Sequence, residues 1–231
     1  RLISELRTLS LVHGCWVADG QSVSDGGFLY QEWLPLLRSL CFQVDITDAE
    51  ASLFKDLVPN IETLLGRPIP NPPPIKPEAS LARLANTMIG LLKRLTKPLL
   101  LILEDLHWGR SESLALLAQV AAAATALPLL IVGTYRSDES PGLPKTLPSF
   151  RPMQLQRLQR RDIEQLSESM LGPIGQRPQL VDYLVRQTEG NVFFAVEIVR
   201  ALAENAGELE GIGRGELPEN VLTVGIGQII E

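Results

Sequence analysis

Apolar residues recur along this chain with two different spacings, which predict an alternation of helices and strands. A spacing of three to four residues, as over residues 80–95, is typical of an amphipathic helix. Residues 99–103 and 129–132 are instead uninterrupted aliphatic runs, which are typical of strands covered on both faces of a sheet. The pattern predicts helices over residues 1–11, 28–40, 49–65, 80–95, 111–125, 161–171, 178–187 and 191–205, and strands over residues 12–18, 99–104 and 127–135.

The order of these elements predicts an α/β unit followed by a helical one. Helix, strand, helix and strand in succession form a βαβ pattern, which implies parallel neighbouring strands. A Pro/Gly/Ser-rich break and a short strand at residues 153–155 precede a purely helical pattern. We therefore expect an α/β core over residues 1–155, a helical unit over residues 156–206, and a linker with the start of a further element over residues 207–231.

Composition and charge exclude several classes of function. No apolar run reaches the roughly 18 residues of a membrane span, and the N-terminus lacks the pattern of a secretory signal. We expect a cytoplasmic protein without a membrane partner. The formal net charge is −6 and Lys and Arg form no cluster beyond short pairs, so no direct contact with nucleic acid is expected. Cys15 and Cys41 lack metal-ligand spacing and are expected to be reduced core thiols.

The candidate chemistry lies where the most apolar strand ends. Glu104 and Asp105 follow five aliphatic residues directly, and ligands bind at this end of the strands in open parallel sheets. An unpaired buried carboxylate is costly, and a divalent cation with a hydrated phosphate is one partner that would stabilise it. The alternative is a structural acidic pair that caps the next helix or meets an arginine.

An arginine follows the neighbouring strand and is a second candidate. Arg136 stands just after the apolar run at residues 129–132, so a parallel sheet would direct it to the same edge, where it could bind a terminal phosphate. The alternative is a surface arginine paired with Asp138 or Glu139. His107 is more typical of a packed or capping histidine than of a catalyst.

Three segments together resemble a known family. Residues 99–108 (LLLILEDLHW), residues 129–139 (LLIVGTYRSDE) and residues 188–194 (TEGNVFF) are similar, in order and spacing, to motifs of the STAND branch of the AAA+ ATPases. That branch occurs in LuxR-type regulators, adenylate-cyclase-associated proteins and bacterial multidomain kinases. The resemblance implies an α/β, P-loop NTPase-like parallel sheet flanked by helices, an all-helical lid, and the start of a winged-helix segment.

The resemblance also implies roles for individual residues. It makes Glu104 the Mg²⁺ ligand, Asp105 the residue that polarises the attacking water, and Arg136 the phosphate sensor. Gly190 and Asn191 are expected near the adenine of bound ATP or ADP.

Two departures from the family pattern concern nucleotide binding. Val192 stands where the family usually has proline after Gly-Asn, and the sequence contains no phosphate loop of the form GxxxxGK[ST]. Residues 1–7 resemble the helix that directly follows that loop. We therefore expect these 231 residues to bind ATP weakly or not at all. The uncapped first helix and residues 217–221, which resemble the entry to a winged helix, favour a fragment over a gene product that has discarded nucleotide binding.

Two hypotheses of function follow. The first is an ATPase module, hydrolysing ATP to ADP and phosphate, that acts as a switch in a multidomain signalling protein. Its partners would be the nucleotide and the effector and sensor domains of the same polypeptide, with a homo-oligomer left open. The second is a non-enzymatic interaction scaffold that keeps the fold. A third hypothesis is an AAA+ loader of the replication type. Such a protein needs a basic surface that faces DNA, and the net charge of −6 disfavours it.

Overall fold

A computed structural model describes residues 1–24, 27–74 and 77–206. The chain divides into two compact units, Arg1–Pro152 and Met153–Glu231, and each unit is treated by itself below. The linker and winged-helix start predicted over residues 207–231 lie outside the described residues. Within the described ranges, no helix is long and apolar enough to cross a membrane.

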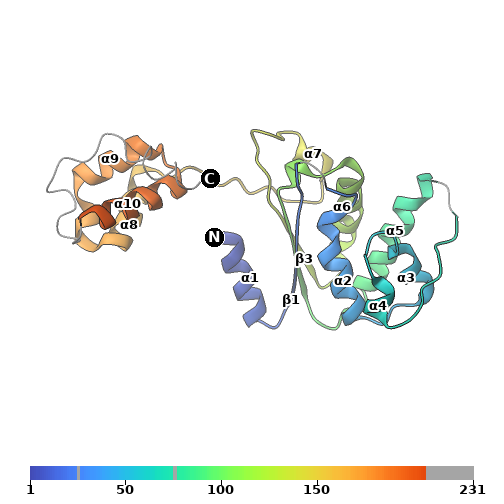
Figure 1. Ribbon diagram of the computed structural model, residues 1–231. Coiled ribbons are helices and arrows are strands. Elements are labelled where there is room, and N and C mark those ends of the chain that lie inside the picture. The colour runs from blue at the N-terminus through green and yellow to red at the C-terminus, as the bar shows by residue number, and fades with distance from the viewer. Residues whose placement is uncertain (25–26, 75–76, 207–231) are drawn as a thin grey trace. The chain divides into compact units, whose positions relative to one another are not determined.

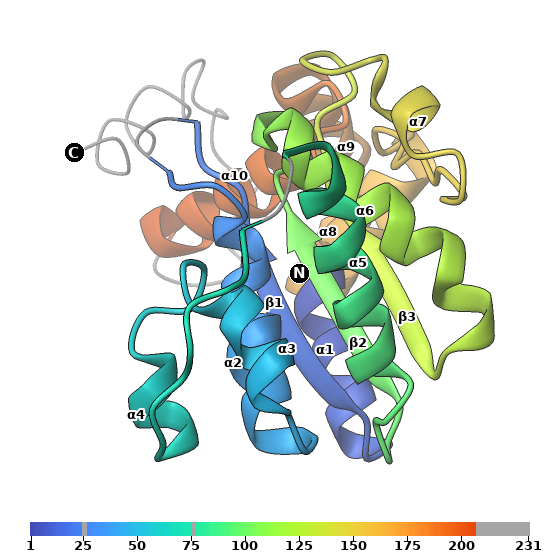
Figure 2. The same cartoon turned by 90° about the vertical axis from the view of Figure 1, so that its right-hand side faces the viewer.

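The first unit is built on a parallel three-stranded sheet in the order β1-β2-β3, which confirms the predicted α/β fold class. Figure 1 views the sheet edge-on, and Figure 2 shows the three strands running side by side. Trp16 is paired with Leu99, and Leu99 with Leu129. The strands are β1 (Trp16–Gln21), β2 (Leu99–Glu104) and β3 (Leu129–Gly133).

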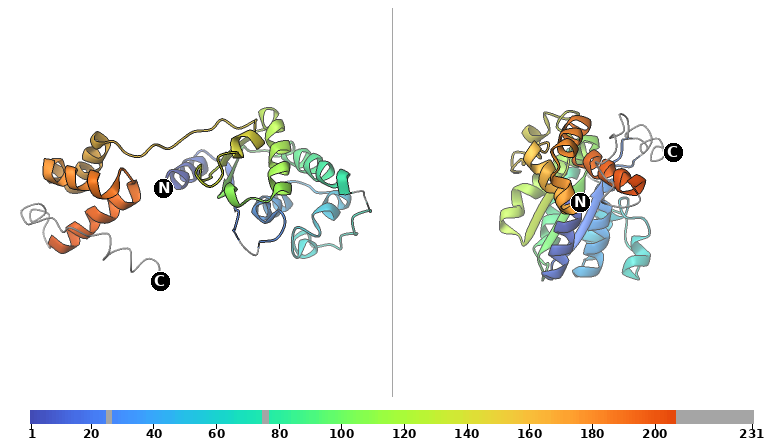
Figure 3. Two further views of the ribbon diagram at one scale, coloured as in Figure 1. Left: turned by 90° about the horizontal axis from the view of Figure 1, so that it is seen from above. Right: turned by 90° about the vertical axis from the view of Figure 1, so that its left-hand side faces the viewer.

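Helices cover the two faces of this sheet unequally. Figures 1 and 2 show α1 alone on one face and α2, α5 and α6 on the other. The same separation is visible from above in Figure 3. The helices of this unit are α1 (Leu2–Val12), α2 (Leu34–Gln43), α3 (Asp48–Phe54), α4 (Ile61–Leu65), α5 (Pro77–Leu92), α6 (Ser111–Ala123) and α7 (Leu143–Thr146), with 3₁₀ turns η1 (Gln31–Trp33), η2 (Leu106–Trp108) and η3 (Ala124–Ala126).

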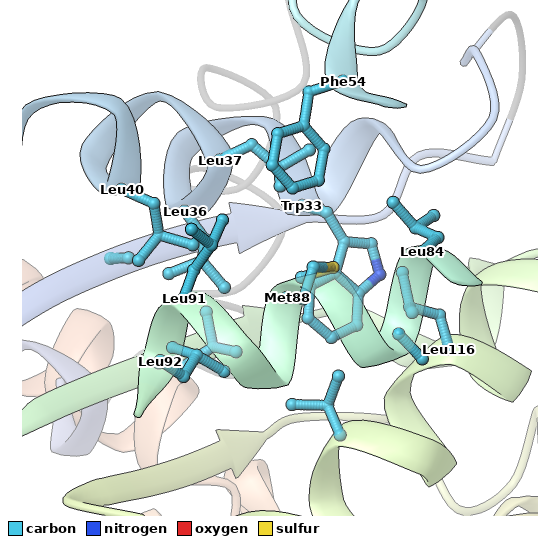
Figure 4. Packing of buried hydrophobic residues seen from close by; sticks show 14 of the residues in the cluster. Trp33, Leu36, Leu37, Leu40, Phe54, Leu84, Met88, Leu91, Leu92 and Leu116 are labelled. Atoms are coloured by element: carbon cyan, nitrogen blue, oxygen red, sulfur yellow. The ribbon is translucent and has the colours of Figure 1, made fainter. Parts of the chain in front are cut away.

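The main core lies between the sheet and the helices of the second face. Trp33 is fully buried among side chains from α2, α3 and α5, as Figure 4 shows. Its indole Nε1 donates a hydrogen bond to Ser113 Oγ at 2.8 Å, so the one polar atom of the ring is satisfied. All five aliphatic residues of β2 are buried, as the sequence predicted.

The opposite face is covered much less completely. α1 packs on β1 and β2 and is tied to β1 by Arg7 Nη2, which lies 2.8 Å from Asp19 Oδ1, but α1 buries none of its own residues. Leu130 of β3 is 55% exposed. The prediction that β3 is covered on both faces was therefore wrong, because α1 does not extend over that strand.

Several predicted boundaries were wrong for local reasons. The first strand is Trp16–Gln21 rather than residues 12–18, because α1 continues to Val12 and the polar residues after Ala18 pair with β2. The helix predicted over residues 49–65 is two helices, α3 and α4. Pro59 and the left-handed Asn60, with φ 62°, separate them, since proline lacks an N–H for the helix.

Two smaller predictions also fail. The helix predicted from residue 28 begins only with η1 and α2, after the left-handed Tyr30. Residues 153–155 form no strand: Met153 and Leu155 are exposed and lie in irregular backbone, since no ladder in the described residues pairs with them.

The second unit is a small helical domain. Its core gathers apolar residues from each of the three helices among the described residues, including Ile163, Leu184 and Ile198. The apolar faces predicted from the sequence therefore pack against one another. Its helices are α8 (Arg160–Leu171), α9 (Pro178–Thr188) and α10 (Val192–Ala206), with the 3₁₀ turn η4 (Gly172–Gln176) between the first two.

Candidate functional site

The three parallel strands bring polar residues together at one edge of the sheet. Gln21 ends β1 and is paired with Glu104, the last residue of β2. Thr134 follows β3, and its N–H donates to the carbonyl of Leu103 at 2.9 Å. In open parallel sheets this edge is where ligands bind. The structure thus places Glu104 and Asp105 beside residues of both neighbouring strands.

Asp105 is held in an unusual backbone conformation. Its φ is 58°, in the left-handed region, which aspartate tolerates better than most residues but which still costs roughly 1 kcal/mol or more. Its N–H donates to Thr134 Oγ1 at 3.1 Å, and Gln21 Nε2 donates to its Oδ2 at 2.8 Å. Thr134, directly after β3, therefore holds the backbone of Asp105, and Gln21 at the end of β1 holds its carboxylate.

The Glu104 carboxylate differs from that of Asp105 in having no hydrogen bond or ion pair with the part of the chain that the structure describes. The residue is half-buried, and its backbone carbonyl accepts from the N–H of Ser22 at 3.0 Å. No hydrogen bond or ion pair reaches its side chain from any of the described residues. A half-buried carboxylate without a donor fits a cation ligand, because Mg²⁺ is commonly held by one or two carboxylates together with phosphate and water oxygens.

No preformed metal cage accompanies this carboxylate. Within residues 1–24, 27–74 and 77–206, no group of three or more His, Cys, Asp or Glu side chains could hold a metal ion.

Arg136 lies in the turn that follows β3. Its Nη1 is 2.8 Å from Glu139 Oε1, and the Arg136 side chain is 61% exposed. The surface ion pair considered in the sequence analysis is therefore present, with Glu139 rather than Asp138 as the partner. Exposed pairs of this kind contribute about 0–1 kcal/mol, so a phosphate that arrived at this edge could displace Glu139 from the guanidinium.

Gly190 and Asn191 belong to the helical unit, where the local fold accounts for both. Gly190 has φ 80°, and a Cβ there would lie 2.4 Å from the carbonyl oxygen of Leu158, so no other residue fits without a shift. Asn191 Oδ1 accepts from the N–H of Phe193 at 3.0 Å, which makes Asn191 the N-cap of α10. Their predicted place near adenine stays a prediction.

A buried acidic residue beside the sheet edge was missed by sequence reasoning. Glu32 is only 6% exposed, and its Oε1 accepts hydrogen bonds from the hydroxyls of Ser22 and Ser113. These bonds tie the segment after β1 to α6. Glu32 also lines a small hollow with Trp108 and Arg110. No signal in the sequence marked it, because it stands within a helical spacing of apolar residues.

Gln21 was also missed, although it contacts a predicted site residue directly. It stands in a Gly/Ser/Asp-rich stretch that reads as a loop, and it is 84 positions away from Asp105. The signal that could have found it is the strand pairing itself, which places the end of β1 beside the end of β2.

The parallel sheet and the acidic residues at its carboxyl edge define an α/β module of the P-loop NTPase type. The family model described as AAA ATPase domain matches residues 1–132, which is more than half of the chain, and the chain belongs to that family. Its members generally use ATP or ADP and Mg²⁺. No curated protein and no solved structure was found to match.

Proposed function

We propose that this chain is the nucleotide-dependent switch of a cytoplasmic multidomain signalling protein of the STAND type. The observation that carries the proposal is the Glu104 carboxylate, which no hydrogen bond or ion pair reaches from the described residues. It lies next to Asp105, which Gln21 and Thr134 hold in place. Membership of the AAA ATPase domain family supports the same reading. The proposed partners are ATP or ADP and the sensor and effector domains of the polypeptide, with a homo-oligomer as a further option.

Each residue at the edge would have a separate task. Glu104 would hold Mg²⁺, which neutralises charge on the phosphate oxygens when it is bound. Asp105 would accept a hydrogen bond from the attacking water and orient it, with Gln21 keeping the carboxylate in position. Arg136 would donate to the terminal phosphate and stabilise the charge that develops there.

The phosphate cradle of this switch would lie outside these 231 residues. No GxxxxGK[ST] loop occurs within them, and such a loop supplies the nest of backbone N–H groups that binds the phosphates.

Binding of Mg·ATP tests the proposal most directly. We would titrate Mg·ATP by calorimetry into this chain and into a form extended upstream through a phosphate loop. We expect binding by the extended form alone. In that form, D105N should retain binding and lose turnover; unchanged turnover would refute the role of Asp105.

The interaction scaffold remains the second candidate. The local roles of Gly190 and Asn191, which need no nucleotide, and the Arg136–Glu139 pair favour it. Absence of Mg·ATP binding by both forms would favour the scaffold and leave Glu104 without a ligand to explain its position.

A further inference from the structure

Glu139 lies between the candidate phosphate sensor and a buried histidine. One carboxylate oxygen, Oε1, is 2.8 Å from Nη1 of Arg136, and the other, Oε2, is 3.5 Å from Nε2 of His107. Arg136 and Glu139 are both partly exposed, whereas the His107 side chain is completely buried. One acidic side chain is therefore shared between a solvent-facing cation and an interior ring.

The His107 ring is the unsatisfied member of this group. Within the described part of the chain, neither Nδ1 nor Nε2 has a hydrogen-bond partner, and an unsatisfied buried polar atom destabilises the folded state. The ring packs against Trp108, with 4.6 Å between the ring centroids. Leu106, the preceding residue, donates its N–H to the carbonyl of Thr134 at 2.8 Å. The ring is thus held close to Glu139, but the contact between Nε2 and Oε2 does not have the geometry of a hydrogen bond.

We propose that Glu139 is a positioning residue that holds Arg136 while no phosphate is bound, and that Glu139 moves to His107 when a phosphate takes Arg136. The inference rests on the proposed function, because it needs a phosphate at the sheet edge. The Arg136–Glu139 pair is weak enough to exchange, since exposed ion pairs contribute little to stability. A hydrogen bond to Glu139 would satisfy the ring nitrogen that is now without a partner.

This exchange would report phosphate occupancy to the interior of the α/β unit. Glu139 stands three residues after Arg136, and the N–H of Ser140 donates to the carbonyl of Arg136 at 3.0 Å, which closes the turn. A shift of Glu139 toward His107 would therefore change the turn that carries the sensor. The turn would respond to the terminal phosphate rather than to the base.

Histidine NMR on the 231-residue chain tests the exchange without any nucleotide. The chain has two histidines, so an H13N background leaves His107 as the only imidazole in a ¹⁵N spectrum. At one fixed pH, R136A removes the competing cation, and we expect the His107 Nε2 resonance to shift as a hydrogen bond to Glu139 forms. Adding E139Q should abolish that shift. A His107 spectrum unaffected by R136A would overturn the proposal.

Nucleotide affinity tests the functional half in the upstream-extended form. The variant E139Q removes the carboxylate that competes for Arg136. We expect it to bind Mg·ATP up to about fivefold more tightly, which is the factor that corresponds to the free energy of a surface ion pair. D138N, which removes the neighbouring charge, is the matched control and should leave affinity unchanged. Equal effects of E139Q and D138N would overturn the proposal.

The two measurements separate this inference from the proposed function. If the extended form does not bind Mg·ATP, the ATPase reading fails, and the His107 spectrum alone decides whether Glu139 exchanges between its two partners. If Mg·ATP binds but E139Q has no effect, the proposed function stands and Glu139 has no part in it.

Discussion

The candidate residues of the two units differ in how far the fold itself explains them. Gly190 and Asn191 in the helical unit have complete local roles, a turn that admits no side chain and a helix cap. For the Glu104 carboxylate in the α/β unit there is no such local role, since no hydrogen bond or ion pair reaches it from the described residues. Motif resemblance alone does not distinguish these cases, but the local contacts do.

This difference leads to an expectation about stability and function. Residues that the fold requires should destabilise the protein when they are replaced, whether or not a nucleotide binds. Residues kept for a ligand should be dispensable for folding. Urea unfolding separates the two groups, because Trp16, Trp33 and Trp108 all lie in the first unit and report on it by fluorescence, while circular dichroism reports on all helices.

The largest effect is expected for Gly190→Ala. The added Cβ would meet the Leu158 carbonyl oxygen at 2.4 Å, at a residue with φ 80°, so we expect a loss of about 1–3 kcal/mol in unfolding free energy, seen in the circular dichroism transition. Gly90→Ala is the control. Gly90 lies inside α5 with open space around it, and alanine should stabilise that helix by about 0.5–1 kcal/mol.

Removal of the helix cap should have the next largest effect. Asn191→Ala takes away the acceptor for the N–H of Phe193, and we expect a loss of about 1 kcal/mol in urea unfolding. Asn191→Asp keeps an oxygen acceptor and should preserve stability. If Asn191→Asp preserves stability but weakens Mg·ATP binding in the extended form, Asn191 has a ligand role in addition to the cap.

A smaller effect is expected for Gln21→Ala. The variant removes an exposed hydrogen bond to Asp105, which corresponds to about 0.5–1 kcal/mol of stability. In the extended form we expect kcat for ATP to fall while KM changes little, because Gln21 orients Asp105 rather than binding the nucleotide. A change confined to KM would contradict that assignment.

The smallest effect on stability is expected for Glu104→Gln. Because the carboxylate has no partner in the described chain, its replacement should change the unfolding free energy by less than about 0.5 kcal/mol. The same variant should greatly weaken Mg²⁺-dependent nucleotide binding by the extended form. A loss of stability as large as that of Asn191→Ala would remove the contrast between the two units and make Glu104 structural.

Parts of the fold could be predicted because the local pattern allowed only one arrangement. β2 was placed correctly, since five consecutive aliphatic residues can avoid water only when both faces are covered. The same argument failed for β3, where Leu130 is 55% exposed. Coverage of a strand depends on which helix crosses it, and the strand's own residues do not contain that information.

The position of the candidate residues at the sheet edge was predictable to a similar extent. Glu104, Asp105 and Arg136 could be chosen because charged residues directly after apolar strands point to the edge of a parallel sheet. Gln21 and Glu32 could not, since their importance comes from contacts with residues about 80 positions away. The pairing of Arg136 with Glu139 could be anticipated because the two residues are three apart.

The sequence by itself determined the parallel α/β class, the helical second unit and the position of the acidic pair, because each depends on spacing within one segment. The tertiary structure decided which carboxylate has a partner, that Gln21 fixes Asp105 in place, and that Glu139 lies between Arg136 and His107. These features arise only when strands distant in sequence are paired side by side, since hydrogen bonds and ion pairs act over a few ångströms.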